Sequence, residues 1–180
     1  MNFLKTGILA TTFCIASAAM AQEIQFGAHG GLGLPMGSLG DALDDHPGLI
    51  LGGHVGLYYG NGHELRPRLD YTYYKGGYTP VGHGEYDRNK ITAWGLGCDY
   101  LYYTDMRPQG LYLIGGLGYQ WWTVSPNHAS DSNHSGLSMA LGAGFRTNRN
   151  LSLEGRFTTG QFRSNDGQAN ALQIIASMRF

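Results

Sequence analysis

The final stretch of the sequence, LQIIASMRF at residues 172–180, alternates apolar and polar side chains and ends on an aromatic ring. Successive side chains of a strand point to opposite faces, so the residues at even positions form an apolar face and those at odd positions a polar one. Only Ile175 interrupts the alternation. The stretch is therefore predicted to be a strand that separates an apolar from a polar environment.

The same period of two recurs along the whole chain. Eight stretches carry it, each of roughly ten residues, which is the length that a tilted strand needs to cross a bilayer. No apolar run after the N-terminal segment reaches the roughly 18 to 20 residues of a transmembrane helix. The predicted strands are Glu23–Leu34, Gly48–Tyr59, His63–Lys75, Lys90–Thr104, Gly110–Thr123, Gly136–Thr147, Asn150–Phe162 and Ala169–Phe180.

The connections between these strands alternate in length. Short turns rich in Gly, Asn and Pro, as tight hairpins require, lie at residues 59–62, 105–109 and 147–150. Longer polar loops lie between them, at residues 35–47, 76–88, 124–135 and 163–168. Short turns at one rim and long loops at the other are typical of outer-membrane barrels.

The N-terminal segment, residues 1–21, has the features of a secretory signal peptide. Lys5 supplies its basic start, residues 8–18 its apolar stretch, and the small-x-small sequence at residues 19–21 its cleavage site. The mature domain is therefore expected to span residues 22–180.

Cleavage at this site would remove one of the 12 basic residues and none of the 13 acidic residues, which leaves a formal charge of −2. This balance argues against a nucleic-acid partner, because such a partner requires a basic face. Cys98 would be the one remaining cysteine, so no intramolecular disulfide is expected.

Charged side chains gather on the polar faces of the strands, which we assign to the lumen. Unpaired charges are costly to bury, so we expect a structural network of ion pairs, with Asp99 near Arg68 and with Glu154 across a tight hairpin from Arg146. Its members are Glu64, Arg66, Arg68, Asp70, Asp99, Arg146, Glu154 and Arg156, together with Arg179. His29 and His54 should also point inward as a hydrogen-bonded pair, since two imidazoles alone make a poor metal site.

Aromatic side chains are expected to form two belts at the headgroup levels. Near the short turns we place Tyr58, Tyr59, Tyr100, Tyr102, Tyr103, Tyr112 and Phe180, and near the long loops Tyr71, Tyr73, Trp94, Tyr119, Trp121 and Trp122. Inward glycines such as Gly95, Gly97, Gly116 and Gly118 should leave room for long charged side chains, because a small barrel is filled by its own side chains.

With these features the chain resembles the small outer-membrane barrels of Gram-negative bacteria: the OmpX-like proteins, the OmpA barrel domain and the opacity-type porin-fold group. The resemblance implies an all-β, eight-stranded antiparallel transmembrane up-and-down barrel with both termini in the periplasm. It also implies that the barrel-assembly machinery reads the last strand, with Phe180 and Met178 as the assembly signal. OmpA-type proteins continue into a peptidoglycan-binding domain that this sequence lacks, so no cell-wall anchoring is expected.

The resemblance favours a role in outer-membrane integrity or in surface interaction through the four long loops. The expected partners are outer-membrane lipids and lipopolysaccharide, a host or phage contact stays open, and no catalytic residue, cofactor or metal is expected. A small-solute pore is the main alternative, although wide pores need about sixteen strands.

Two further alternatives are weaker. A lipid-A-modifying enzyme could use His128 and Ser130 with Glu154, but the first two residues are expected in an outer loop and Glu154 deep in the lumen. A soluble lipocalin-like binder would need an apolar interior and a polar exterior, which is the reverse of the predicted facing.

Overall fold

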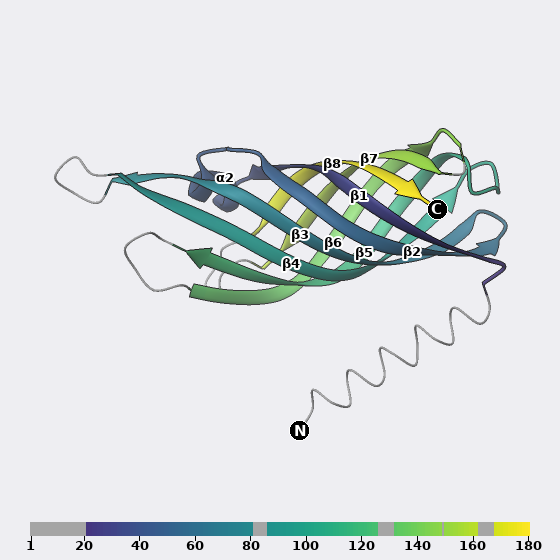
Figure 1. Ribbon diagram of the computed structural model, residues 1–180, viewed down its shortest axis with the longest axis horizontal. Coiled ribbons are helices and arrows are strands. Elements are labelled where there is room, and N and C mark those ends of the chain that lie inside the picture. Colours follow the sequence, from purple (N-terminus) through teal and green to yellow (C-terminus); the bar gives the residue numbers. More distant parts are fainter. Residues whose placement is uncertain (1–20, 81–85, 126–131, 149, 162–167) are drawn as a thin grey trace, which may run out of the picture.

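The computed structural model of the protein describes residues 21–80, 86–125, 132–148, 150–161 and 168–180, and the structural statements below refer to these residues. Eight antiparallel strands follow one another around a closed barrel, in which the first strand pairs with both the second and the last (Figure 1). The strands are β1 (Glu23–Met36), β2 (Gly48–Gly60), β3 (His63–Pro80), β4 (Tyr86–Tyr103), β5 (Gly110–Ser125), β6 (Ser132–Arg146), β7 (Leu151–Gly160) and β8 (Asn170–Arg179).

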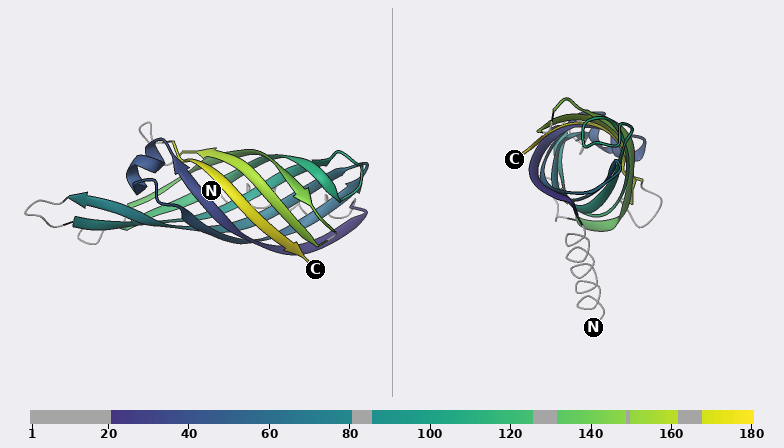
Figure 2. Two further views of the ribbon diagram at one scale, coloured as in Figure 1. Left: turned by 90° about the horizontal axis from the view of Figure 1, so that it is seen from above. Right: turned by 90° about the vertical axis from the view of Figure 1, so that its right-hand side faces the viewer.

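The short turns and the C-terminus lie at one end of the cylinder, which we call the turn end. The β3–β4 hairpin and the β1–β2 connection lie at the other, which we call the loop end (Figures 1 and 2). The eight predicted strands and the closed antiparallel barrel are confirmed. Closure satisfies the backbone hydrogen bonds between strands within the barrel, as the hydrocarbon core of a membrane demands.

Strand pairing continues beyond the sequence pattern at the loop end. Residues 76–88, predicted as a loop, mostly belong to a hairpin in which Thr79 still pairs with Asp87. The structure likewise extends β5 and β6 to Ser125 and Ser132. Apolar alternation is needed only where one face meets hydrocarbon, so the pattern fades outside the membrane while the backbone ladder persists.

A short helix, α2 (Ser38–Leu43), lies in the predicted loop between β1 and β2. Leu39 and Leu43 are one helical turn apart and therefore share a face, and both are almost completely buried. The helix ends where Asp44 adopts a left-handed backbone conformation, with φ of 52°. In the described part of the chain, no helix has the length and apolar character needed to cross a membrane.

The outer surface of the barrel is apolar. Leu137, Leu141 and Phe180 are 69%, 70% and 76% exposed, respectively, and large apolar side chains on all eight strands share this outward facing. Charged side chains such as Arg66 and Glu154 are buried inside. This facing is opposite to that of a soluble binder, and it agrees with the predicted orientation.

Three predicted belt residues were wrongly placed. Tyr103, Tyr112 and Trp122 point inward, with exposures of 0%, 0% and 4%. The physical reason is the period of two: Tyr103 lies four residues after the inward Asp99, an even separation that keeps both on one face. Tyr71, Trp94 and Trp121 do lie on the outer face, as predicted.

Candidate functional site

The candidate site is the filled lumen, which is built mainly by alternate residues of β3. Glu64, Arg66, Arg68 and Asp70 are spaced by two along this strand, so all four project inward. Glu154 and Arg156 of β7 approach them from across the barrel, and Asp99 of the neighbouring β4 joins them. In the structure the network residues face the lumen, with Arg179 among them, and Asp70 is the least buried of the set.

At the turn end of the lumen, Glu64 holds two arginines. Its carboxylate accepts hydrogen bonds from Arg179, from Arg146 at 3.4 Å and from the hydroxyl of Tyr103 at 2.9 Å. The Arg146 guanidinium also lies over the Tyr103 ring, 4.8 Å from its centroid, and donates to the Pro108 carbonyl at 3.2 Å. One carboxylate thus serves two cations, and ring faces and a backbone carbonyl also contact Arg146. Its Nη2 is buried and has no hydrogen-bond partner among the described residues.

In the middle of the lumen, Arg66 binds Glu154 through both terminal nitrogens. This bidentate geometry is the strongest form of a charge-assisted hydrogen bond. The Tyr112 hydroxyl donates to the same carboxylate at 2.9 Å. Oδ2 of Asp99 accepts from Arg66, Arg68 and Arg156 at 3.0, 3.3 and 3.0 Å, respectively.

A second chain of contacts runs from Arg68 to the two histidines. Arg68 donates through Nε to Oδ2 of Asp70 at 2.7 Å, and Oδ1 of Asp70 lies 2.6 Å from Nε2 of His29. Nδ1 of His29 lies 3.3 Å from Nδ1 of His54. The predicted inward histidine pair is therefore confirmed, and Asp70 orients it.

One predicted pairing was wrong. Arg68 meets Asp99 as expected, but Arg146 binds Glu64 where the sequence suggested Glu154. Glu154 lies opposite Gly144 in the β6–β7 ladder, and Arg146 lies opposite Ser152. Glu154 and Arg146 are therefore two residue pairs apart along the barrel, and each finds a partner across the lumen.

The sequence reasoning missed Tyr103 and Tyr112 as lumen residues. Each places its hydroxyl on a buried carboxylate, and their ring centroids lie 5.0 Å apart with the ring planes tilted by 47°. Leu101 and Ile114 complete this small cluster. The signal that could have found them is parity, because inward Asp99 and Gly116 fix the facing of every second residue on β4 and β5.

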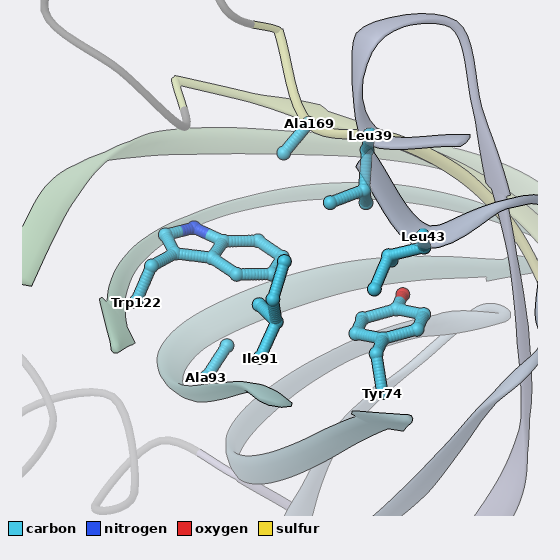
Figure 3. Close-up of a cluster of buried hydrophobic side chains, with 7 residues drawn as sticks. All are labelled: Leu39, Leu43, Tyr74, Ile91, Ala93, Trp122 and Ala169. Carbon is cyan, nitrogen blue, oxygen red and sulfur yellow. The ribbon is translucent and has the colours of Figure 1, made fainter. Parts of the chain in front are cut away.

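An apolar cap closes the loop end of the lumen (Figure 3). Leu43 of α2 lies next to the ring of Tyr74, and Leu39 lies above it near Ala169. The Tyr74 ring stacks against Trp122 with ring centroids 6.4 Å apart. A side chain at Gly48 would clash with the Tyr74 ring, so glycine is required there. The cap consists of Leu39, Leu43, Tyr74, Ile91, Ala93, Trp122 and Ala169.

A small polar cavity separates the cap from the ion-pair network. It has a volume of about 40 Å³, and Arg68, Arg156 and Thr72 line it together with glycines of β4 and β5. Space of this size holds one or a few water molecules. The predicted inward glycines, which include Gly95 and Gly116, are confirmed as part of its wall.

The charged side chains of the lumen bind one another, so few of their polar atoms are available to contact a substrate. Both Glu154 oxygens accept hydrogen bonds from Arg66. His128 and Ser130, the other members of the possible lipid-A-modifying site, lie outside the described residues. Among the residues that the structure describes, no cluster of three or more His, Cys, Asp and Glu side chains could hold a metal ion.

The sequence matches the family described as "Outer membrane protein beta-barrel domain" over residues 6–180. A search of curated protein sequences gives no match.

Several solved structures share the fold. The N-terminal β-barrel domain of Pseudomonas aeruginosa OprF is 15% identical, with a TM-score of 0.55 over 89% of this chain and 99% of that one. Ail, the attachment invasion locus protein of Yersinia pestis, is 12% identical, with a TM-score of 0.58 over 87% and 97% of the two chains. Neisserial surface protein A is 20% identical, with a TM-score of 0.53 over 87% and 95%.

Proposed function

Because the chain belongs to the outer-membrane protein β-barrel domain family, we propose that it is a closed structural barrel that supports outer-membrane integrity and presents its long hairpins for surface contact. The protein is an outer-membrane β-barrel. The observation that carries the proposal is the double closure of the lumen, by the ion-pair network and by the apolar cap. The proposal includes no catalytic step and no cofactor.

The protruding β3–β4 hairpin supports the surface role. Its two strands pair from His63↔Tyr102 to Pro80↔Tyr86, whereas β4 pairs with β5 only as far as Lys90↔Ser125. The hairpin therefore extends beyond the rim as a separate ribbon (Figure 2). Ail, which shares the fold, has been crystallised with the heparin analogue sucrose octasulfate. In this proposal the loop end faces outward.

The processing of the chain is part of the same proposal. Residues 1–21 would be the export signal, and the barrel-assembly machinery would recognise Phe180 and Met178. Both of these side chains lie on the outer face, 76% and 57% exposed, where a membrane-embedded partner can reach them.

The test separates the two roles with one variant. Replacing residues 76–89 by Asn-Gly keeps Lys75 opposite Lys90, so it should give a tight hairpin and leave the barrel and its contribution to detergent resistance intact. In a strain lacking the protein, this variant should restore detergent resistance to the wild-type level but should not restore binding of cells to a sulfated-glycan surface. If it restores neither, or if the deletion itself changes neither property, the proposal is wrong.

A small-solute pore remains the competing function. Purified protein in planar bilayers should give no reproducible current steps, whereas a sixteen-stranded porin in the same bilayers should conduct. Discrete steps that change when Arg68→Gln is introduced would replace the structural role with a conducting one.

A further inference from the structure

The two lysines of the predicted mature chain lie opposite each other on the outside of the barrel. Lys75 of β3 pairs directly with Lys90 of β4, and the chain has no other lysine except Lys5. Both side chains are exposed. Like charges directly opposite on neighbouring strands destabilise a sheet, so an anion bound between the two ammonium groups would relieve this repulsion.

The outward direction of both lysines follows from the period of two. Tyr74 and Ile91 are buried in the cap, so their neighbours Lys75 and Lys90 face the other side of the sheet. In the part of the chain that the structure describes, none of the ion pairs involves either lysine. Both ammonium groups can therefore bind an anion that comes from outside this set of residues.

The lysines lie just beyond a row of aromatic rings. Tyr71, Trp94 and Trp121 are directly paired across β3, β4 and β5, and the first two rings are 4.9 Å apart. Rings of this kind on a lipid-facing surface lie at the headgroup level. Lys75 lies four residues after Tyr71, and Lys90 lies four residues before Trp94. Both lysines are therefore roughly 13 Å from the aromatic row, toward the loop end.

The side chain of Lys90 leans back toward these rings. Its Nζ lies 5.6 Å from the centroid of the Tyr73 ring, which belongs to the pair between the aromatic row and the lysines. A long basic side chain that bends along an apolar surface places its charge at the membrane boundary. This direction brings the Lys90 ammonium group back toward the headgroup level that the aromatic row indicates.

We propose that Lys75 and Lys90 form a binding site for the phosphate of a membrane-lipid headgroup, with the Tyr73 ring as its inner wall. The site holds the anion between two cations on adjacent strands. It rests on the location of the barrel in the outer membrane and not on closure of the lumen, so it can fail without affecting the proposed structural role.

The experiment measures lipid binding to the folded barrel. The protein is refolded into phosphatidylcholine vesicles that contain lipid A with either two phosphates or one, and retained lipid is counted by native mass spectrometry. The wild type should prefer the bisphosphorylated lipid. Lys75→Gln and Lys90→Gln should each reduce retention by about fivefold, the effect expected of one basic residue at an anionic membrane surface.

A matched control is Arg107→Gln, which removes an exposed charge at the turn end and should leave lipid retention unchanged. Lys90→Arg should keep most of the binding, because it keeps the charge. Equal retention by the wild type and the Lys75→Gln/Lys90→Gln variant would overturn the proposal, as would an equal loss in Arg107→Gln. Free inorganic phosphate is added as a competitor, and complete displacement at millimolar concentration would show a general anion site instead of a lipid site.

Discussion

At the scale of single residues, the lumen depends on a few carboxylates that each bind several cations. Oδ2 of Asp99 accepts from three arginines, and Glu64 binds two. The facing of these residues could be predicted, because the period of two acts between near neighbours. Their partners could not, since the pairs Arg66–Glu154 and Arg179–Glu64 join positions 88 and 115 residues apart.

The replacement Glu64→Gln should destabilise the barrel strongly. It would leave Arg146 and Arg179 inside the lumen without their shared carboxylate, and breaking a buried pair in this way costs about 3–5 kcal/mol. Urea titration in lipid vesicles measures the free energy of unfolding. Glu23→Gln, which alters a less buried carboxylate at the start of β1, serves as the control and should change it by less than about 1 kcal/mol.

Coupling within the pair offers an internal check on this reading. Arg179→Gln should cost less in the Glu64→Gln background than in the wild type, because the interaction has already been removed. Fully additive effects of the two replacements would contradict the direct contact between them.

At the scale of elements, the eight strands were predictable and α2 was not. The strands repeat one pattern across ten or more residues, whereas α2 has six residues and offers only Leu39 and Leu43 as an apolar face. A helix this short is unstable alone, so it forms because the mouth of the barrel presents Tyr74 and Trp122 to it. Its existence is a tertiary effect that local sequence cannot specify.

The replacement Leu43→Asp should detach α2 from the mouth of the barrel. It would place a charge among the buried side chains of the cap, which is unfavourable without a partner. Hydrogen–deuterium exchange should then show loss of protection for the hydrogen-bonded amides of residues 41–46. Ala42→Asp adds the same charge at the neighbouring exposed position and should retain protection, so equal loss in both variants would count against the cap.

At the scale of the whole molecule, the barrel is closed by the pairing of β1 with β8. This pairing runs from Gly27↔Arg179 to Met36↔Asn170, and Phe180 adds a backbone hydrogen bond to Phe26. The closed topology could be predicted from the alternating connections and from the resemblance to a known architecture. The exact register could not, because it depends on how side chains from all eight strands fill one lumen.

The replacement Phe180→Ala should reduce assembly into the outer membrane. The closed barrel should resist unfolding by detergent at room temperature, so unboiled protein from outer-membrane fractions should migrate as a compact band on electrophoresis. We expect the proportion of compact protein to fall severalfold in the variant if the terminal ring is part of the assembly signal.

The control for this variant is Phe26→Ala, which removes an exposed ring from the adjacent strand. It should leave the compact band near the wild-type level. An equal fall in both variants would mean that the ring acts through lipid contact and not through recognition.

The position of Arg179 also has a consequence for the order of assembly. This residue arrives on the final strand, yet the carboxylate that it neutralises belongs to β3. Until the last strand is seated, that carboxylate must stay hydrated, because an unpaired charge in a dry interior is costly. Pairing of β8 with β1 and loss of water from the lumen are therefore coupled. An intermediate arrested before that step would be an open sheet with a hydrated inner face.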